Sequence, residues 1–542
     1  MNKYTKAILC FAWMSVTSAY AQEAVQDSTL NRTVVVENEY NPEVMDAYKV
    51  NIMPKIEEPE IAKKEIVYAA EGKAFKHWQF NAMQPYTRRF MKPDAKRGYM
   101  SAAYGNRNNI DVKGGYLWDI TPKDQLDLMG IFYGHSGKTD LENAVRDWNG
   151  RLFRGEMEMN YRHLFRKVAM DLGGSYAQQV YNYMIDNEKE YTPSQHLSIT
   201  NAHVGIASTD KECQWQYGAE ANLSLYGRKY STNHIRKGTE TQVKAKAYAS
   251  YQIDKKQSAG VDLGISNLMY GTTFKDYTFI QLNPYYTLQH GNIRLRGGVH
   301  LDMRTGFNSS FMVSPDVMAD FTFADSYVFY VKATGGTALN DYERLHRLTP
   351  YWNPESAQQF NATYTPLDAS IGFKASPVPC LGFNIRAGYR MLDDEIFAMP
   401  EAYYTTVVQQ DANVAYVGAR LDYNYGKLFD MHLDGEFYNW DTKAEHEHLL
   451  VFKPQFKIDF NLNTCFIDHL NVYARYHFEQ RKKIDGEKVN PVSELSLGAD
   501  YQILEPINVF VVANNLFNNK HFTEYGIPAQ GIYIMGGLSF RF

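Results

Sequence analysis

Charged and histidine side chains recur at every second position in the last quarter of the chain. The set comprises Arg420, Asp430, His432, Asp434, Glu436, Lys453, Lys457, Asp459, Arg475, His477, Glu494 and Asp500. Successive side chains of a β-strand point to opposite faces, so residues spaced by two share one face. With both signs of charge on neighbouring strands, this face would bind a polar solute or dock another segment of the chain. The candidate binding residues are Arg420, Asp430, His432, Asp434, Glu436, Arg475 and His477. The alternative is a solvated wall whose charges pair across strands.

The sequence contains no pattern that points to catalysis. Nucleophilic catalysis needs a Ser or Cys with a base and an orienting group, and there is no Gly-x-Ser-x-Gly run, paired-carboxylate motif or phosphate-binding loop. His446 and His448 flank Glu447, but two imidazoles without a third ligand rarely hold a metal. The formal net charge is -5 without long runs of one sign, which gives no reason to expect nucleic-acid binding. We therefore predict no enzyme activity, metal or cofactor.

Strict alternation of apolar and polar residues predicts strands that face lipid on one side and a wet lumen on the other. The final strand shows it most clearly. One face carries Ile532, Ile534, Gly536, Leu538, Phe540 and Phe542, and the other carries Tyr533, Met535, Gly537, Ser539 and Arg541. We expect Phe540 and Phe542 to face lipid and Arg541 to face the lumen.

The alternation predicts 22 strands between residues 97 and 542, in an all-β antiparallel transmembrane barrel. Connections from even to odd strands are short and rich in turn residues, as in 254–257 and 376–379. The other connections are mostly long: 134–150, 182–195, 227–240, 336–361, 392–412, 439–450, 480–491 and 518–530. Short periplasmic turns alternate with long outside loops in such barrels. A miscount by one strand would exchange the two sets, whereas a miscount by one hairpin would leave the alternation intact.

The composition agrees with a membrane barrel. Aromatic residues make up 14% of the chain and 41 residues are Tyr, whose apolar ring and wet hydroxyl suit a membrane interface. The mean hydropathy is negative, and after the first 21 residues there is no apolar run of the roughly 18 residues that a spanning helix needs.

The segment before residue 97 divides into a leader and an arm. Lys3 and Lys6 precede an apolar run, and Ala19-Tyr20-Ala21 follows it, as in a signal peptide that ends at residue 21. Residues 22–96 contain Pro-Glu-rich stretches and are predicted to form a short periplasmic or lumenal arm. Within this arm, residues 69–90 combine aromatic and basic side chains, so we expect them to enter or cap the periplasmic mouth.

Two motifs resemble a known family. Asn514-Asn515-Leu516-Phe517-Asn518, ahead of the alternating final strand, resembles the last hairpin of TonB-dependent outer-membrane receptors. Leu345-His346-Arg347-Leu348 and Asn353-Pro354-Glu355 are similar to their mid-barrel Asn-Pro motif, without the longer family pattern. The resemblance covers residues 97–542. It implies a 22-stranded barrel in the outer membrane of a Gram-negative bacterium, surrounded by outer-membrane lipid.

The N-terminal part departs from that family. Residues 22–96 are too few for the plug domain of these receptors and show none of its motifs. Thr33, Val34, Val35 and Val36 resemble the family's energy-coupling box, and residues 33–54 are similar to the arms of plugless receptor-like proteins of Bacteroidota. The alternative is a short β-prone run that pairs with a neighbour. The resemblance implies a TonB-like or other periplasmic envelope protein as partner.

Two functions remain open from the sequence. The first is transport of a solute of unknown identity across the outer membrane, and the second is a structural or assembly role in which the arm recruits a periplasmic partner. Barrels of 22 strands are normally plugged, so an open one would leak. The arm, the lumen side chains and loops, or a partner must narrow the pore.

Overall fold

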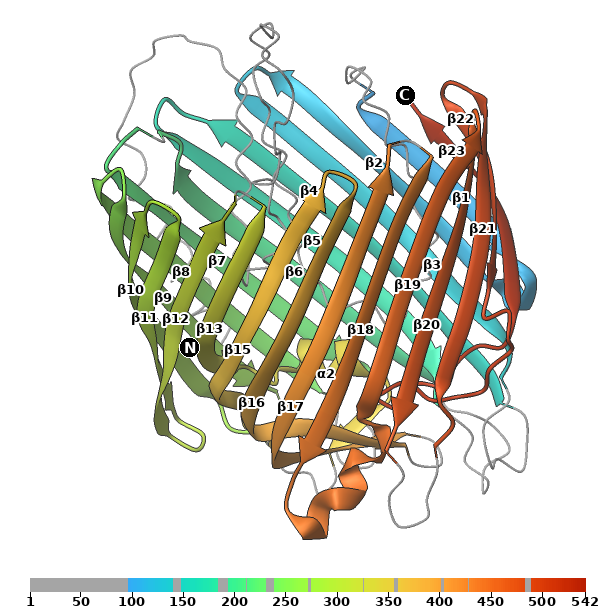
Figure 1. The fold of residues 1–542 in the computed structure, drawn as a ribbon. Helices are drawn as coiled ribbons and strands as arrows, with labels where there is room; N and C mark the ends of the chain where they lie inside the picture. Colours follow the sequence, from blue (N-terminus) through green and yellow to red (C-terminus); the bar gives the residue numbers. More distant parts are fainter. Residues whose placement is uncertain are drawn as a thin grey trace, which may run out of the picture.

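The computed structural model describes residues 96–542 except 140–147, 184–193, 211, 231–237, 272–273, 325, 355–358, 401–403, 427 and 483–488. The chain forms a closed antiparallel barrel of 22 strands, as predicted (Figure 1). The wall strands are β1 (Gly98–Gly105), β2 (Ile110–Thr121), β3 (Asp124–Thr139), β4 (Trp148–Leu164), β5 (Val168–Asn182), β6 (Ser194–Ser208), β7 (Trp215–Arg228), β8 (Thr239–Asp254), β9 (Gln257–Tyr270), β10 (Tyr277–His290), β11 (Ile293–Thr305), β12 (Ser310–Phe323), β13 (Tyr327–Ala338), β15 (Thr363–Val378), β16 (Leu381–Pro400), β17 (Thr405–Tyr425), β18 (Phe429–Asp441), β19 (Pro454–Ile467), β20 (Leu470–Arg481), β21 (Val492–Leu504), β22 (Ile507–Asn514) and β23 (Tyr533–Arg541).

The barrel closes where its first and last strands meet. Each wall strand pairs with its neighbour in the chain, and β1 pairs antiparallel with β23 from Tyr99 opposite Arg541 to Gly105 opposite Met535. A closed wall leaves no strand edge with unpaired backbone groups, which lipid could not satisfy. A further short strand, β14 (Trp352–Pro354), is not part of this wall.

The predicted alternation along β23 is confirmed. Leu538 and Phe540 are 58% and 42% exposed, whereas Met535 and Ser539 are buried. Phe542, also exposed, stacks on Phe540 with a ring-centroid distance of 5.4 Å. Exposed apolar side chains occur on strands all round the barrel, as expected of a wall that faces lipid.

The two rims of the barrel differ. Short turns such as Asp254 to Gln257 and the C-terminus lie at one rim, the turn rim. The opposite loop rim carries η2 (Asn106–Asn108), α2 (Tyr342–Leu348) and η3 (Ala444–Phe452). Among the described residues no helix is long and apolar enough to cross a membrane.

The expectation of a long loop over residues 392–412 is wrong. β16 and β17 continue past the length that spans a bilayer and stay paired until Pro400 opposite Thr405, with a register shift near Leu392. The β-branched run 405–408 favours strand, and a hairpin that extends beyond the lipid satisfies its own backbone. The predicted loop 134–150 is likewise shortened, because β3 continues to Thr139 and β4 begins at Trp148.

Candidate functional site

Between β13 and β15, residues 339–354 and 359–362 fold back into the barrel. They contain α2 and β14, and we call these described residues the strap. Figure 1 shows α2 within the ring of strands, near the rim that carries η3. The side chain of Asp341 caps α2 by accepting a hydrogen bond from Arg344 N at 2.7 Å. Tyr342, Leu345 and Trp352 are each 1% exposed, although connections usually lie on the surface.

The strap crosses the whole mouth of the barrel. At one end β14 pairs parallel with β17, with Trp352 opposite Thr405. At the other, His346 Nε2 lies 3.2 Å from Gln179 Oε1 on β5. β17 is the sixteenth strand of the wall and β5 the fifth, so they lie eleven positions apart in a ring of 22. The strap therefore joins opposite sides of the barrel at its loop rim.

Polar contacts fix the α2 half of the strap to β8. Asp341 Oδ2 accepts a hydrogen bond from Gln242 Nε2 at 3.2 Å and lies 3.5 Å from Lys244 Nζ. Tyr342 N donates to Glu240 Oε2 at 2.9 Å. Burial alone would raise the pKa of Asp341, but the Lys244 ammonium and the Arg344 amide hold it below its usual value. Asp341 is therefore ionised and anchors the start of α2.

Aromatic side chains make the remaining contacts between the strap and the barrel wall. The Tyr342 ring packs against Tyr226 at 5.6 Å and against Trp352 at 5.1 Å. Tyr351 packs edge-on against Trp148 at 6.1 Å and Tyr181 at 5.7 Å. Since each such pair contributes about 0.5–1.5 kcal/mol beyond burial of its area, these contacts stabilise the closed position of the strap.

A second loop meets the strap in the mouth. Residues 515–532 connect β22 to β23, and we call them the last loop. Ile527 is buried in one cluster with Trp148 and Tyr351, and Tyr525 packs against the cluster that contains Tyr342. The two loops therefore share apolar contacts across the loop rim.

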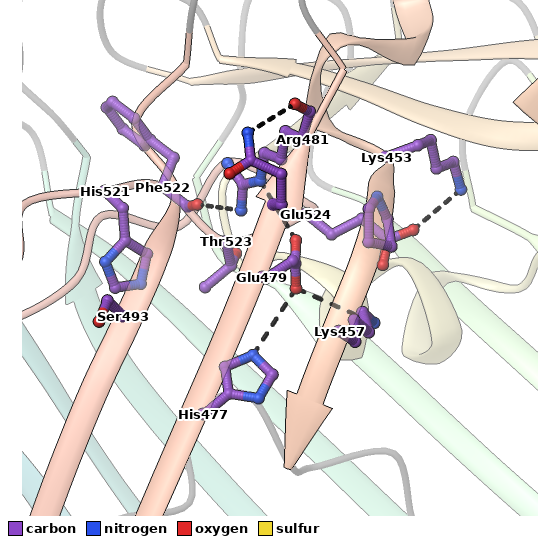
Figure 2. A network of polar contacts seen from close by, with 12 residues as sticks. Lys453, Lys457, His477, Glu479, Arg481, Ser493, His521, Phe522, Thr523 and Glu524 are labelled. Carbon is purple, nitrogen blue, oxygen red and sulfur yellow. Dashed lines mark hydrogen bonds and ion pairs between the residues drawn. The ribbon is translucent and has the colours of Figure 1, made fainter. Parts of the chain in front are cut away.

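A buried ionic group, which we call the latch, holds the last loop to the wall. Its members are Glu395, Lys453, Glu479, Arg481 and Glu524. Lys453 Nζ lies 3.0 Å from Glu395 Oε1 on β16 and 3.0 Å from Glu524 Oε1 in the last loop, and its side chain is 3% exposed. Arg481 Nη2 donates to Phe522 O at 2.5 Å, while Arg481 Nε bonds Glu479 Oε1 at 3.2 Å. Figure 2 shows Lys453, Glu479, Arg481 and Glu524 together with Lys457 and His477.

The protonation states of the latch follow from its charges. Burial alone would lower the pKa of Lys453, but Glu395 and Glu524 raise it above its ordinary value. Burial would raise the pKa of Glu524, whereas Lys453 and Lys457 hold it lower. Both groups are thus ionised at neutral pH, and each is the counter-ion of the other.

The predicted binding residues lie on the lumen face of β17 to β20 and pair largely with charges on the same face. The ion pairs are Arg420–Asp422 (3.1 Å), His432–Asp430 (3.4 Å), Arg386–Asp434 (3.1 Å), Arg386–Glu436 (2.5 Å) and His477–Asp459 (2.7 Å). Arg475 makes no ion pair with the described part of the chain. The geometry is that of a wall with paired charges, the alternative given above, and solute binding by these residues stays a prediction.

Several residues of the site were not singled out from the sequence. Arg386 occupies the face opposite Ile385 and Ala387, so the alternation along β16 was a readable signal. Glu240, Gln242 and Lys244 also alternate along β8. No signal of period two shows that the strap turns inward. The proposed coupling box, Thr33 to Val36, lies outside the described residues, as does the rest of the arm before Lys96.

Comparison with known proteins adds the fold. No family model and no curated protein matches the chain in sequence. The FrpB iron transporter of Neisseria meningitidis superposes with a TM-score of 0.66 at 12% identity, over 82% of this chain and 81% of that one. The copper transporter OprC superposes with a TM-score of 0.62 at 11% identity, over 82% of this chain and 80% of that one. P. aeruginosa FpvA bound to an iron pyoverdine superposes with a TM-score of 0.61 at 11% identity, over 82% of this chain and 71% of that one. The chain shares the closed 22-stranded barrel fold of these transporters. At these identities the similarity establishes the fold alone.

Proposed function

We propose that this protein is a transport barrel of the outer membrane that takes up a polar solute and is not an enzyme. The observation that carries the proposal is the strap across the loop rim. A barrel that only anchors a complex needs no ordered cross-bar held by separate polar and aromatic contacts. An uptake barrel needs one, because the pore must stay closed until solute binds.

The lumen wall supports the same function. Charges of both signs line β16 to β20, and Arg420, Asp434 and His477 are 24%, 28% and 34% exposed. Paired charges that remain wet offer exchangeable hydrogen-bonding groups to a polar solute moving along the wall. Fold similarity to iron and copper transporters agrees with this proposal.

The periplasmic end of the mechanism rests on residues 22–96. We propose that this arm replaces a plug domain, with residues 69–90 in or near the turn-rim mouth. The lumen-facing carboxylates of β18, Asp430 and Asp434, are the expected partners of its basic side chains. Residues 33–36 would then engage a TonB-like periplasmic protein that supplies energy.

Conductance of the purified protein in a planar bilayer tests the proposal. We expect the full chain to be closed and a variant lacking residues 22–96 and 342–354 to conduct. Deletion of either segment alone should give an intermediate conductance. Barrels that stay closed in every variant would contradict the transport role. Stoichiometric copurification with other envelope proteins would then support the structural or assembly role.

A further inference from the structure

A buried arginine beneath the strap has no anionic partner among the described residues. Arg228 ends β7 at the loop rim and is 2% exposed. Its Nη1 donates one long hydrogen bond, 3.5 Å, to Trp352 O, and the neutral Tyr226 hydroxyl is a further polar neighbour. Nε and Nη2 make no hydrogen bond of good geometry in the described part of the chain. No carboxylate of that part forms an ion pair with it. A buried guanidinium normally has an anionic partner because burial removes its hydration.

The strap covers this cation with an aromatic ring. The guanidinium carbon of Arg228 lies 4.3 Å from the centroid of the Trp352 ring. A cation–π contact replaces part of the lost hydration, but it leaves the in-plane N–H donors unused. Those donors form the fork that recognises a carboxylate or phosphate.

The neighbouring polar atoms are also mostly donors. The Tyr226 hydroxyl lies next to the side chains of Arg228 and Trp352, and the Tyr181 hydroxyl lies next to that of Tyr183. All of these neighbours are neutral or cationic, so none supplies a negative charge. The rings of Tyr181 and Tyr226 lie close to His346, at 5.9 and 6.1 Å. The site therefore combines several hydrogen-bond donors on β5, β7 and the strap, and no carboxylate of the described residues pairs with Arg228.

The electrostatic environment is positive. Burial lowers the pKa of His346 well below its usual value, and the charges of Arg228, Arg154 and Arg347 lower it further. Arg154 and Arg347 have carboxylate neighbours, Glu156 at 3.0 Å and Glu343 at 3.9 Å. Arg228 is the one of these three arginines without such a neighbour in the described residues.

We infer that Arg228 is the receptor for an oxyanion, a carboxylate or phosphate group of a ligand that arrives from outside, and that Trp352 covers it in the ligand-free barrel. The inference deepens the proposed function, on which it rests, by naming the ligand class. Binding of the anion would satisfy Nε and Nη2 and release Trp352. Because Trp352 belongs to β14, its release would detach this end of the strap from β17.

The site predicts opposite effects of Arg228→Met on binding and on stability. The substitution removes the charge and keeps an unbranched apolar side chain, so binding should be lost. Replacement of an uncompensated buried charge by an apolar group is often neutral or stabilising, so the thermal unfolding temperature should stay equal or rise. If Arg228 were only an anchor for Trp352, the unfolding temperature would fall.

Fluorescence of Trp352 in the full chain measures binding. Citrate and inorganic pyrophosphate serve as probes, and Trp352→Phe gives the signal to subtract. We expect a saturable fluorescence change with at least one of the probes. The affinity for that probe should be at least tenfold weaker in Arg228→Gln. It should be unchanged in Arg151→Gln, a control on an exposed residue of the same rim. Competition by purified lipopolysaccharide would assign the anion to a lipid headgroup, and its absence to a free solute.

Two results would overturn the assignment: no saturable change in the wild type at millimolar probe, or equal affinity in Arg228→Gln and the wild type. Failure of the proposed function is distinguishable. A barrel that binds oxyanions through Arg228 but never conducts contradicts transport and leaves the oxyanion site intact. A barrel that conducts, but whose oxyanion binding does not depend on Arg228, contradicts the site and leaves transport intact.

Discussion

Lys453 joins the last loop to the barrel wall through two nearly buried carboxylates. Replacing it with Met keeps a long side chain but removes the charge that lies 3.0 Å from both Glu395 and Glu524. Two carboxylates would then remain almost buried, without their main counter-ion. We expect the last loop to undock locally while the barrel wall stays folded, because the strand ladders do not involve this side chain.

The expected magnitude follows from burial. Removing one partner of a buried ion pair costs about 3–5 kcal/mol, since the other charge is left uncompensated. Glu524 can relieve part of this by binding a proton, so we take the lower end, about 3 kcal/mol. One decade of equilibrium constant corresponds to about 1.4 kcal/mol, so the undocked population should rise about a hundredfold.

Lys482→Met is the matched control. Its ammonium lies 2.7 Å from Glu447 Oε1, but the two side chains are 41% and 47% exposed, and such exposed pairs contribute about 0–1 kcal/mol. Hydrogen exchange of the Thr523 and Gly526 amides, both bonded within the last loop, reports undocking. Exchange in Lys453→Met that is no faster than in Lys482→Met would refute the latch.

Three further predictions concern the strap, the last loop and the arm. Asn353 and Thr406 are partners across β14 and β17. A disulfide between cysteines at these two positions should tie the strap to the wall, abolish solute uptake under oxidising conditions and allow it again after reduction. Uptake that does not depend on reductant would contradict opening of the strap during transport. Burial and the charge of Arg481 lower the pKa of His521 from 6.5 to about 4. The undocked loop therefore binds the proton more tightly than the docked loop, so docking keeps its full stability above pH 6.5 and loses up to about 3 kcal/mol as the pH falls toward 4. Hydrogen exchange of the Gly526 amide should show this loss in the wild type and not in His521→Asn. Deletion of residues 69–90 should raise sensitivity of cells to large antibiotics; if sensitivity is unchanged while the shortened barrel assembles, the arm is not the seal.

The wall could be predicted from the sequence because every lipid-facing side chain within the bilayer must be apolar. A strand that meets hydrocarbon on one side must alternate, and Leu538 and Phe540 show the alternation as clearly in the structure as in the sequence. Strand ends were predicted less well where β16 and β17 leave the lipid. Beyond the bilayer both faces of a strand meet water or loops, so alternation no longer marks a strand. The sequence pattern therefore predicts a loop where the hairpin continues to Pro400 and Thr405.

The site was harder to predict, since its contacts join segments far apart in the chain. The lumen charges were readable one strand at a time, but the pairing of Asp434 with Arg386 depends on register between three strands. The motif around His346 and Asn353 indicates a family resemblance and no inward path. Its inward path depends on contacts with Gln179 and Thr405, which lie on opposite walls and leave no periodic trace in residues 339–362.

The two halves of the strap are held unequally, and this sets the order in which the mouth can open. Both halves bury apolar side chains, Leu345 in α2 and Trp352 in β14. The α2 half also has an ionised Asp341 beside Lys244. The β14 half pairs with β17 and covers Arg228, whose buried charge has an aromatic ring in place of an anion. A ligand shifts a conformational equilibrium only by its difference in affinity for the two states, and an oxyanion gains most where a cation lacks a partner. The β14 half should therefore detach first, with α2 still docked as the hinge, so that binding at Arg228 opens the β17 side of the mouth before the rest.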